Sequence, residues 1–286
     1  MPYLRPYRPV ISVLFVGFAA AGLAACDVVI NSMDGEFGGG RFKAEQSYAK
    51  TFTVNAQGAT LELVNTNGKI EVEAVDGTAI DVKATITAKG ATDEAAREAL
   101  KQVEVKEDAT PTRVRIEAKH PNRRQSIEVR YTVRVPRGVK IDVRNTNGAV
   151  DMTGLGGGVR AETTNGSVKG RGLTCAVDAS TTNGGIDIQL AALVPEGIRL
   201  ETTNGGITLG LPPEAKATLT ARCVHGSVSV TDLKFERDRE SSGRRVDGKI
   251  NGGGAPLTVE TVNGGVRIRP TERSAPAAVG TGKRSS

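Results

Sequence analysis

The stretch Val159–Ile188, VRAETTNGSVKGRGLTCAVDASTTNGGIDI, contains one short pattern twice and decides the fold class. Each copy has apolar residues at alternate positions, then Thr-Thr-Asn-Gly, then apolar residues at alternate positions again. A period of two is typical of a β-strand with one buried face. Each copy therefore predicts a strand, a tight corner and a second strand.

This corner recurs along most of the chain. Six copies carry Asn-Gly and one carries His-Gly, and the corner residues are Asn67, Asn147, Asn165, Asn183, Asn204, His225 and Asn263. From the second copy onward they are 18, 18, 21, 21 and 38 residues apart. Because Asn and Gly adopt positive φ at the lowest cost, we expect a left-handed backbone at these corners. We refer to these residues as the turn ladder.

The residues on either side of the corner form columns when the copies are aligned on the asparagine. Aliphatic residues dominate the columns six and four before it and three and five after it, and polar residues fill the columns between. Four copies have threonine two positions before the asparagine, at Thr163, Thr181, Thr202 and Thr261. We expect these threonines to form a polar ladder that points inward.

Two arrangements fit such units. In a hairpin array, each corner would be a two-residue turn between antiparallel strands. In a β-solenoid, each corner belongs to a coil, and like residues stack about 4.8 Å apart. The recurrence of one residue type at one corner favours an all-β solenoid with one short helix in the N-terminal half, and the hairpin array stays as the alternative.

Several longer stretches point to a family. They are LELVNTNGKIEV (61–72), YTVRVPRG (131–138), IDVRNTNGAVDM (141–152) and INGGGAPLTVETVNGGVRI (250–268). In this order the chain resembles the bacterial putative-adhesin domain family over roughly residues 45 to 270. The resemblance implies a β-solenoid-like structure and an unknown biochemical function.

The N-terminus predicts export. Arg5 and Arg8 precede the uncharged stretch Val10–Leu23, which ends in Leu-Ala-Ala-Cys at Cys26. This resembles the lipobox of a lipoprotein signal peptide, and the alternative is an ordinary signal peptide with a chance cysteine. We expect Cys26 to carry lipid and to hold the protein in the cell envelope, either facing the periplasm or at the cell surface. Asp27 leaves the choice between inner and outer membrane open.

The remaining chain divides by composition. The expected parts are a signal peptide (1–25), a flexible tether (26–44), a capping β region with one helix (45–138), the repeat solenoid (139–270) and a disordered tail (271–286). The helix is expected from Thr92 to Val103, with Thr92 as its N-cap. The charged segment Lys234–Arg245 reads as a surface loop.

Composition excludes several function classes. Without Arg5 and Arg8 the chain has 36 basic and 32 acidic residues, an excess too mild to indicate nucleic acid. His120 and His225, the two histidines, are interpreted as turn residues and not as catalytic groups. No His/Cys spacing suggests a metal or cofactor site. Cys175 and Cys223 fall in different columns, so we expect both to be free and buried.

One outward column offers candidate surface contacts. Three positions before the corner residue stand Arg144, Glu162, Glu201, Arg222 and Glu260. The first hypothesis is a non-enzymatic envelope lipoprotein that presents a polar β surface to an envelope protein or glycan, with its oligomeric state open. The alternative is a protein that binds or acts on envelope polysaccharide, which would need carboxylates such as Glu162 and Glu201 on one face. A third hypothesis is a purely structural or signalling accessory of the envelope.

Overall fold

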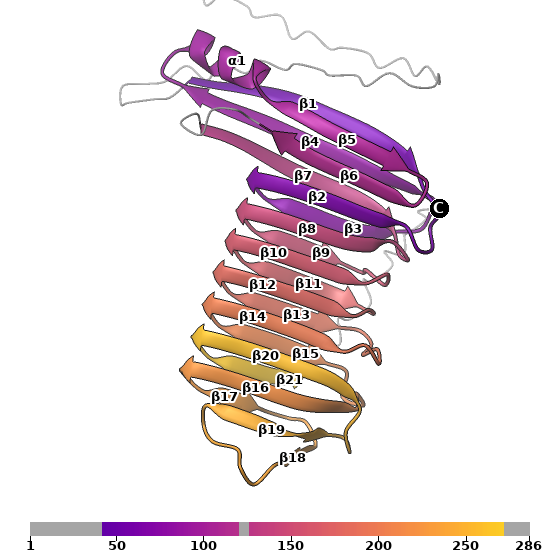
Figure 1. Ribbon diagram of the computed structural model, residues 1–286, viewed down its shortest axis with the longest axis vertical. Coiled ribbons are helices and arrows are strands. Elements are labelled where there is room, and N and C mark those ends of the chain that lie inside the picture. The colour runs from indigo at the N-terminus through magenta and orange to yellow at the C-terminus, as the bar shows by residue number, and fades with distance from the viewer. Residues whose placement is uncertain (1–41, 120–125, 272–286) are drawn as a thin grey trace, which may run out of the picture.

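The computed structural model describes residues 42–119 and 126–271. These residues form two long sheets, called here sheet A and sheet B, and the helix α1 (Asp93–Lys101) (Figure 1). Sheet A has 10 strands in the spatial order β1 (Phe42–Thr53), β4 (Ala79–Gly90), β7 (Ser126–Pro136), β3 (Ile70–Val75), β9 (Val150–Thr153), β11 (Val168–Leu173), β13 (Ile186–Leu190), β15 (Ile207–Leu211), β21 (Val266–Pro270) and β17 (Val228–Val230). Sheet B has 11 strands in the spatial order β18 (Phe235–Arg237), β19 (Arg245–Ile250), β16 (Ala217–His225), β20 (Ala255–Asn263), β14 (Ile198–Asn204), β12 (Val177–Asn183), β10 (Val159–Asn165), β8 (Lys140–Asn147), β2 (Thr60–Asn67), β6 (Arg113–Lys119) and β5 (Glu104–Thr110).

The repeating unit is a rung, which we define as a strand of sheet B, a corner and the next strand of sheet A. The rungs that contain a turn-ladder residue are β2–β3, β8–β9, β10–β11, β12–β13, β14–β15, β16–β17 and β20–β21. Neighbouring rungs pair in parallel in both sheets. The two strands of a rung lie in different sheets and do not pair with each other, as the strands of a hairpin would. This confirms the β-solenoid and excludes the hairpin array.

The core lies between the two sheets and follows from the alternation of residues along each strand. In β14, for example, Ile198 and Leu200 are buried, whereas Arg199 points outward. Each aliphatic column of one sheet packs against those of the other, so the core is one narrow layer that runs along the whole solenoid. Residues with β-branched side chains suit this pleated, half-buried surface.

The order of the rungs in space departs from chain order at both ends. The rung β20–β21 lies between β14–β15 and β16–β17, although it comes last in the chain (Figure 1). At the other end, β2–β3 lies between β6 and β7 on one side and β8–β9 on the other. Consequently β16–β17, and not the last rung of the chain, forms the C-terminal end of the stack.

Both ends of the stack carry elements outside the rungs, although β17 remains the outermost strand of sheet A at the C-terminal end. At the N-terminal end α1 packs against β1 and β4, and the Thr92 hydroxyl caps it by accepting from the Ala95 N–H at 3.1 Å, as predicted. The Tyr48 hydroxyl of β1 donates to Glu107 of β5 at 2.8 Å, which links the edges of the two sheets. At the C-terminal end the antiparallel strands β18 and β19 lie outside β16. These elements protect edges that could otherwise recruit foreign strands.

Several boundaries differ from the expected ones. β1 begins at Phe42, inside the segment 26–44 that we expected to be a tether. The strands of the region 45–138 lie in the same two sheets as the solenoid, so residue 138 does not separate two units. The segment Lys234–Arg245 is not only a loop, because it contains β18, which pairs with β19.

The signal peptide, Cys26, His120 and the tail beyond Thr271 lie outside the described residues. Within the described part of the chain, no helix has the length and apolar character needed to cross a membrane.

Candidate functional site

The turn ladder forms one continuous column of side chains. The Asn147 amide donates to the Asn67 side-chain oxygen at 2.6 Å, and the next three asparagines along the stack repeat this bond at 2.8 Å. Asn263 donates to Asn204 at 2.7 Å. At the end of the column His225 lies beside Asn263 in register. Each rung with an asparagine at its corner is thereby bonded to the next such rung.

The expected left-handed backbone is found at four of the seven corners, and there at the glycine and not at the asparagine: Gly68, Gly148, Gly226 and Gly264 have positive φ. Among the described residues, positive φ outside glycine occurs only at Asp232 and Asn251. The glycine after the asparagine is required mainly by crowding: a Cβ on Gly184 would lie 2.0 Å from the Gly166 carbonyl oxygen of the neighbouring rung. The asparagine recurs because its amide can both donate and accept along the column.

The threonine ladder points inward, and each threonine side chain is about nineteen-twentieths buried. Each hydroxyl donates to the glycine carbonyl of the preceding rung, for instance Thr181 to Gly166 at 2.9 Å. Together with the asparagine column, these bonds satisfy the polar groups at the corner. They fix neighbouring rungs in one register and so hold the outer face of sheet B in a fixed geometry.

The five candidate contacts lie in one row on the outer face of sheet B. The parallel registers place them, with Ser180, in the spatial order Arg144, Glu162, Ser180, Glu201, Glu260 and Arg222. We call this the candidate row. Glu201 lies directly opposite Glu260, because β20 is inserted between β14 and β16. Glu162 and Glu201 are separated by the strand that carries Ser180.

Two of the glutamates in the candidate row are paired within their own strands. Glu162 contacts Arg160 at 2.6 Å, and Glu201 contacts Arg199 at 2.5 Å. The Glu162 carboxylate raises the pKa of the Arg160 guanidinium, mainly through this hydrogen bond. Such exposed pairs contribute little to stability, because water screens the attraction between the two charges. They do neutralise this part of the face.

The C-terminal end of the candidate row has a different character. A shallow hollow there is lined by Thr182, Glu201, Thr203, Arg222, Glu260 and Val262, among others. Val262 and its neighbour Val224 are 39% and 51% exposed, and only Phe42 joins them among the described large apolar residues that are exposed. Sequence reasoning missed both valines. The signal was present, since this outward column holds threonine in five copies and valine in these two.

The remaining residues considered in the sequence take no part in this surface. Cys175 and Cys223 are both free and buried, as predicted, and burial raises the pKa of the Cys175 thiol. His225 is exposed at the end of the turn ladder. Over residues 42–119 and 126–271, no group of three or more His, Cys, Asp or Glu side chains is arranged to hold a metal ion.

Comparison with solved structures finds several bacterial proteins that are similar to this chain at low sequence identity. It is similar to a putative cell adhesion protein from Clostridium sporogenes, at 13% identity and a TM-score of 0.45, covering 79% of this chain and 99% of the other. A putative adhesin from Bacteroides fragilis is similar at 10% identity and a TM-score of 0.36, covering 78% and 96%. A putative lipid binding protein from Parabacteroides distasonis is similar at 8% identity and a TM-score of 0.27, covering 79% and 97%. No curated protein sequence matches the chain.

One family model matches the solenoid directly. It is that of the Toastrack DUF4097 family, and the match covers residues 157–269. This range includes the corners from Asn165 to Asn263 and four of the five candidate contacts. Residues 157–269 are therefore similar to the Toastrack DUF4097 family, in agreement with the resemblance found in the sequence.

Proposed function

We propose that this protein is a non-enzymatic adhesion protein of the cell envelope, which binds its partner with the outer face of sheet B. The observation that carries the proposal is the pair Val224 and Val262, exposed side by side at the hollow next to Glu260 and Arg222. Two adjacent exposed aliphatic groups with charged residues beside them, on a face held rigid from below, offer a partner a small apolar patch with a polar rim.

The rest of the candidate row supports the same face. No ion pair joins Glu260 or Arg222 to another described residue, whereas Glu162 and Glu201 are engaged by arginines of their own strands. A partner can therefore reach charges at the C-terminal end without first breaking an ion pair. The β-branched side chains of the valines also lose little rotamer freedom when they are covered.

The test is binding of the purified protein to immobilised envelope glycans and to intact cells. We expect the double variant Val224→Ser/Val262→Ser to weaken binding by roughly tenfold or more, because contacts at the centre of an interface contribute most of the affinity. The matched control is Thr146→Ser, in the same outward column at the far end. Undiminished binding by the double variant, or an equal loss in the control, would contradict the proposed surface.

The proposal includes a lipid anchor at Cys26. The mature chain would begin there and be held at the membrane by its acyl chains. Replacement of this residue, Cys26→Ser, should release the protein from the membrane fraction, and mass spectrometry of the purified protein should show the lipid mass. A Cys26→Ser variant that still fractionates with membranes would contradict the anchor.

A second candidate function is supported by the Glu201–Glu260 pair. Adjacent strands place the Cα atoms of these glutamates roughly 5 Å apart, so their side chains lie on one face, as paired carboxylates do in some glycoside hydrolases. If the protein cleaves envelope polysaccharide, Glu201→Gln and Glu260→Gln should each abolish product release and leave polysaccharide binding intact. If it only binds, wild-type protein should release no product from isolated cell-wall glycan.

A further inference from the structure

The outer face of sheet A carries a second ordered set of charges, distinct from the candidate row. Two rows of outward residues run along six neighbouring strands, from β3 to β21. The first row is Glu71, Asp151, Lys169, Asp187, Thr208 and Arg267. The second row is Glu73, Thr153, Arg171, Gln189, Gly210 and Arg269.

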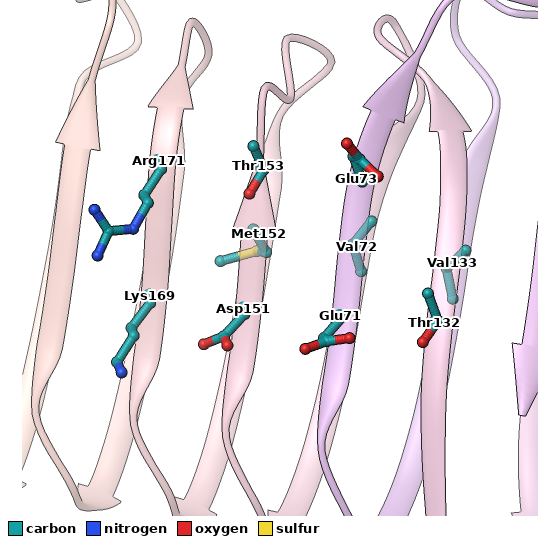
Figure 2. Close-up of a pocket in the computed structure, with 10 residues that line it drawn as sticks. All are labelled: Glu71, Val72, Glu73, Thr132, Val133, Asp151, Met152, Thr153, Lys169 and Arg171. Atoms are coloured by element: carbon teal, nitrogen blue, oxygen red, sulfur yellow. The ribbon is translucent and has the colours of Figure 1, made fainter. Parts of the chain in front are cut away.

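The charges in these rows are separated along the solenoid. Figure 2 shows the N-terminal part, with Glu71 and Asp151 beside Lys169 in the first row, and Glu73 and Thr153 beside Arg171 in the second. The short Thr153 side chain leaves a shallow hollow in this part of the face. The C-terminal part, on β21, carries only the two arginines. Acidic groups thus outnumber basic ones at the β3 end, where Lys69 contacts both Glu71 and Asp151 and Arg134 of β7 lies 3.9 Å from Glu73. The charged groups of the two rows at the β21 end are both basic.

This order is self-complementary about a twofold axis. Consider an axis that lies parallel to the strands on the surface, midway between β11 and β13. It brings each row against the same row of a second copy, with the order of the strands reversed. Glu71 then faces Arg267 of the second copy, and Lys169 faces its Asp187. In the other row Glu73 faces Arg269.

The uncharged positions fit the same axis. The axis sets Asp151 against Thr208 of the second copy, Thr153 against its Gly210 and Arg171 against its Gln189. No two like charges therefore face each other. The outward residues nearest the corner are small on most of these strands, at Ala149, Ser167, Gly185, Gly206 and Gly265. Small residues on both sides allow two flat sheets to approach closely.

Other positions of the axis bring like charges face to face. If the axis is shifted by half a strand spacing, Lys169 faces Lys169 of the second copy, or in the other direction Asp187 faces Asp187. A shift by a whole spacing sets Glu71 against Asp187 in one direction, and Lys169 against Arg267 in the other. Like charges that face each other across an interface cost free energy and suppress the wrong arrangement. The charge pattern therefore selects one register.

We propose that the outer face of sheet A is a homodimer interface, formed by a second copy of this chain about this twofold axis. From strand spacing and rise, six strands offer about 500 Å² per copy, below the ~800 Å² of a standard interface. The dimer is accordingly weak, dependent on concentration and sensitive to salt. It leaves the outer face of sheet B exposed in each copy, so the dimer presents two copies of the candidate row on opposite sides.

The test is sedimentation equilibrium of the full chain at low and high ionic strength, using charge-reversed variants. The acidic-end variant is Glu71→Lys/Glu73→Lys, and the basic-end variant is Arg267→Glu/Arg269→Glu. Each alone should weaken dimerisation by roughly tenfold or more, since like charges would then face each other. A mixture of the two variants should form heterodimers, because every lysine then faces a glutamate and every remaining original pair is kept.

The control variant is Glu162→Lys/Asp178→Lys, which changes the net charge equally on the outer face of sheet B. It should dimerise as the wild type does, and circular dichroism should show that all variants are folded. Recovery of heterodimers in the mixture supports the interface. A wild-type protein that stays monomeric at low salt, variants that dimerise unchanged, or a mixture without heterodimers would overturn it.

Discussion

The rungs in the middle of the solenoid and the rung β16–β17 at its C-terminal end are built on the same columns but bonded differently. In the middle, each corner contributes an asparagine bond and a hydroxyl bond to its neighbour, as Asn183 and Thr181 do. In the terminal rung, Cys223 stands where the threonine would be and His225 where the asparagine would be. Its corner keeps the backbone bond from the Gly264 N–H to the His225 carbonyl at 2.9 Å.

This difference shows what the repeated Thr-x-Asn-Gly sequence is for. Register and burial need only the alternating aliphatic residues and the backbone ladder, which the terminal rung also has. The polar side chains of the corner are an additional clamp, present where a rung has neighbours on both sides. If this account is correct, substitutions at equivalent positions should cost more in the middle than at the end.

The largest effect is expected for the corner glycine. Gly184→Ala should lower the free energy of unfolding by about 3 kcal/mol, because the new Cβ collides with a backbone carbonyl that cannot move alone. Gly185→Ala is the matched control, since its Cβ would meet no atom closer than 3.2 Å. Chemical denaturation of both variants measures the difference. Equal losses would show that backbone freedom, not crowding, determines the need for glycine.

The next effect concerns the inward hydroxyl. Thr181→Val should cost about 1–2 kcal/mol, because it leaves the Gly166 carbonyl without its side-chain donor in a part-buried corner. The adjacent Thr182 is exposed, so Thr182→Val makes the same chemical change without that loss. Urea unfolding should separate the two variants. If both cost the same, the inward ladder adds nothing to the clamp.

The asparagine column should give a smaller effect, since its side chains are partly open to water. Asn183→Ala removes one bond to Asn165 and one from Asn204, and should cost about 1 kcal/mol. His225→Ala, at the end of the same column, should change stability by less than about 0.5 kcal/mol. Thermal denaturation of this pair compares the middle directly with the end. A costlier change at His225 would reverse the comparison.

The smallest effect is a gain. Cys223→Thr/His225→Asn would give the terminal rung the side chains of the middle rungs, with Gly264 and Asn263 as acceptors. We expect a stabilisation of about 0.5–1 kcal/mol, the net value of one or two partly exposed hydrogen bonds. Hydrogen exchange at β16 should slow accordingly. No change there would mean that the terminal rung has no free acceptors to use.

Much of the fold could be predicted from the periodicity alone. The column alignment around Asn165 and Asn183 predicted the strands, the corner and the stacked side chains, because a period of two defines one buried face. The five candidate contacts share one sequence column, three positions before the corner residue. The parallel registers place all five in one row. The reason for the corner glycine was not predictable, since it depends on the carbonyl of another rung.

The sequence by itself determined which residues face inward, which face outward and where the chain turns, because these depend only on local periodicity. The tertiary structure decided the order of the rungs, and with it the placement of Glu201 next to Glu260 on adjacent strands. Asn204 and His225 are 21 residues apart, the same spacing as Asn183 and Asn204, which are in adjacent rungs. Rungs with the same columns fit one another in any order, so local sequence cannot choose between them. The choice depends on the connections that cross the ends of the stack and on the strands that cover them.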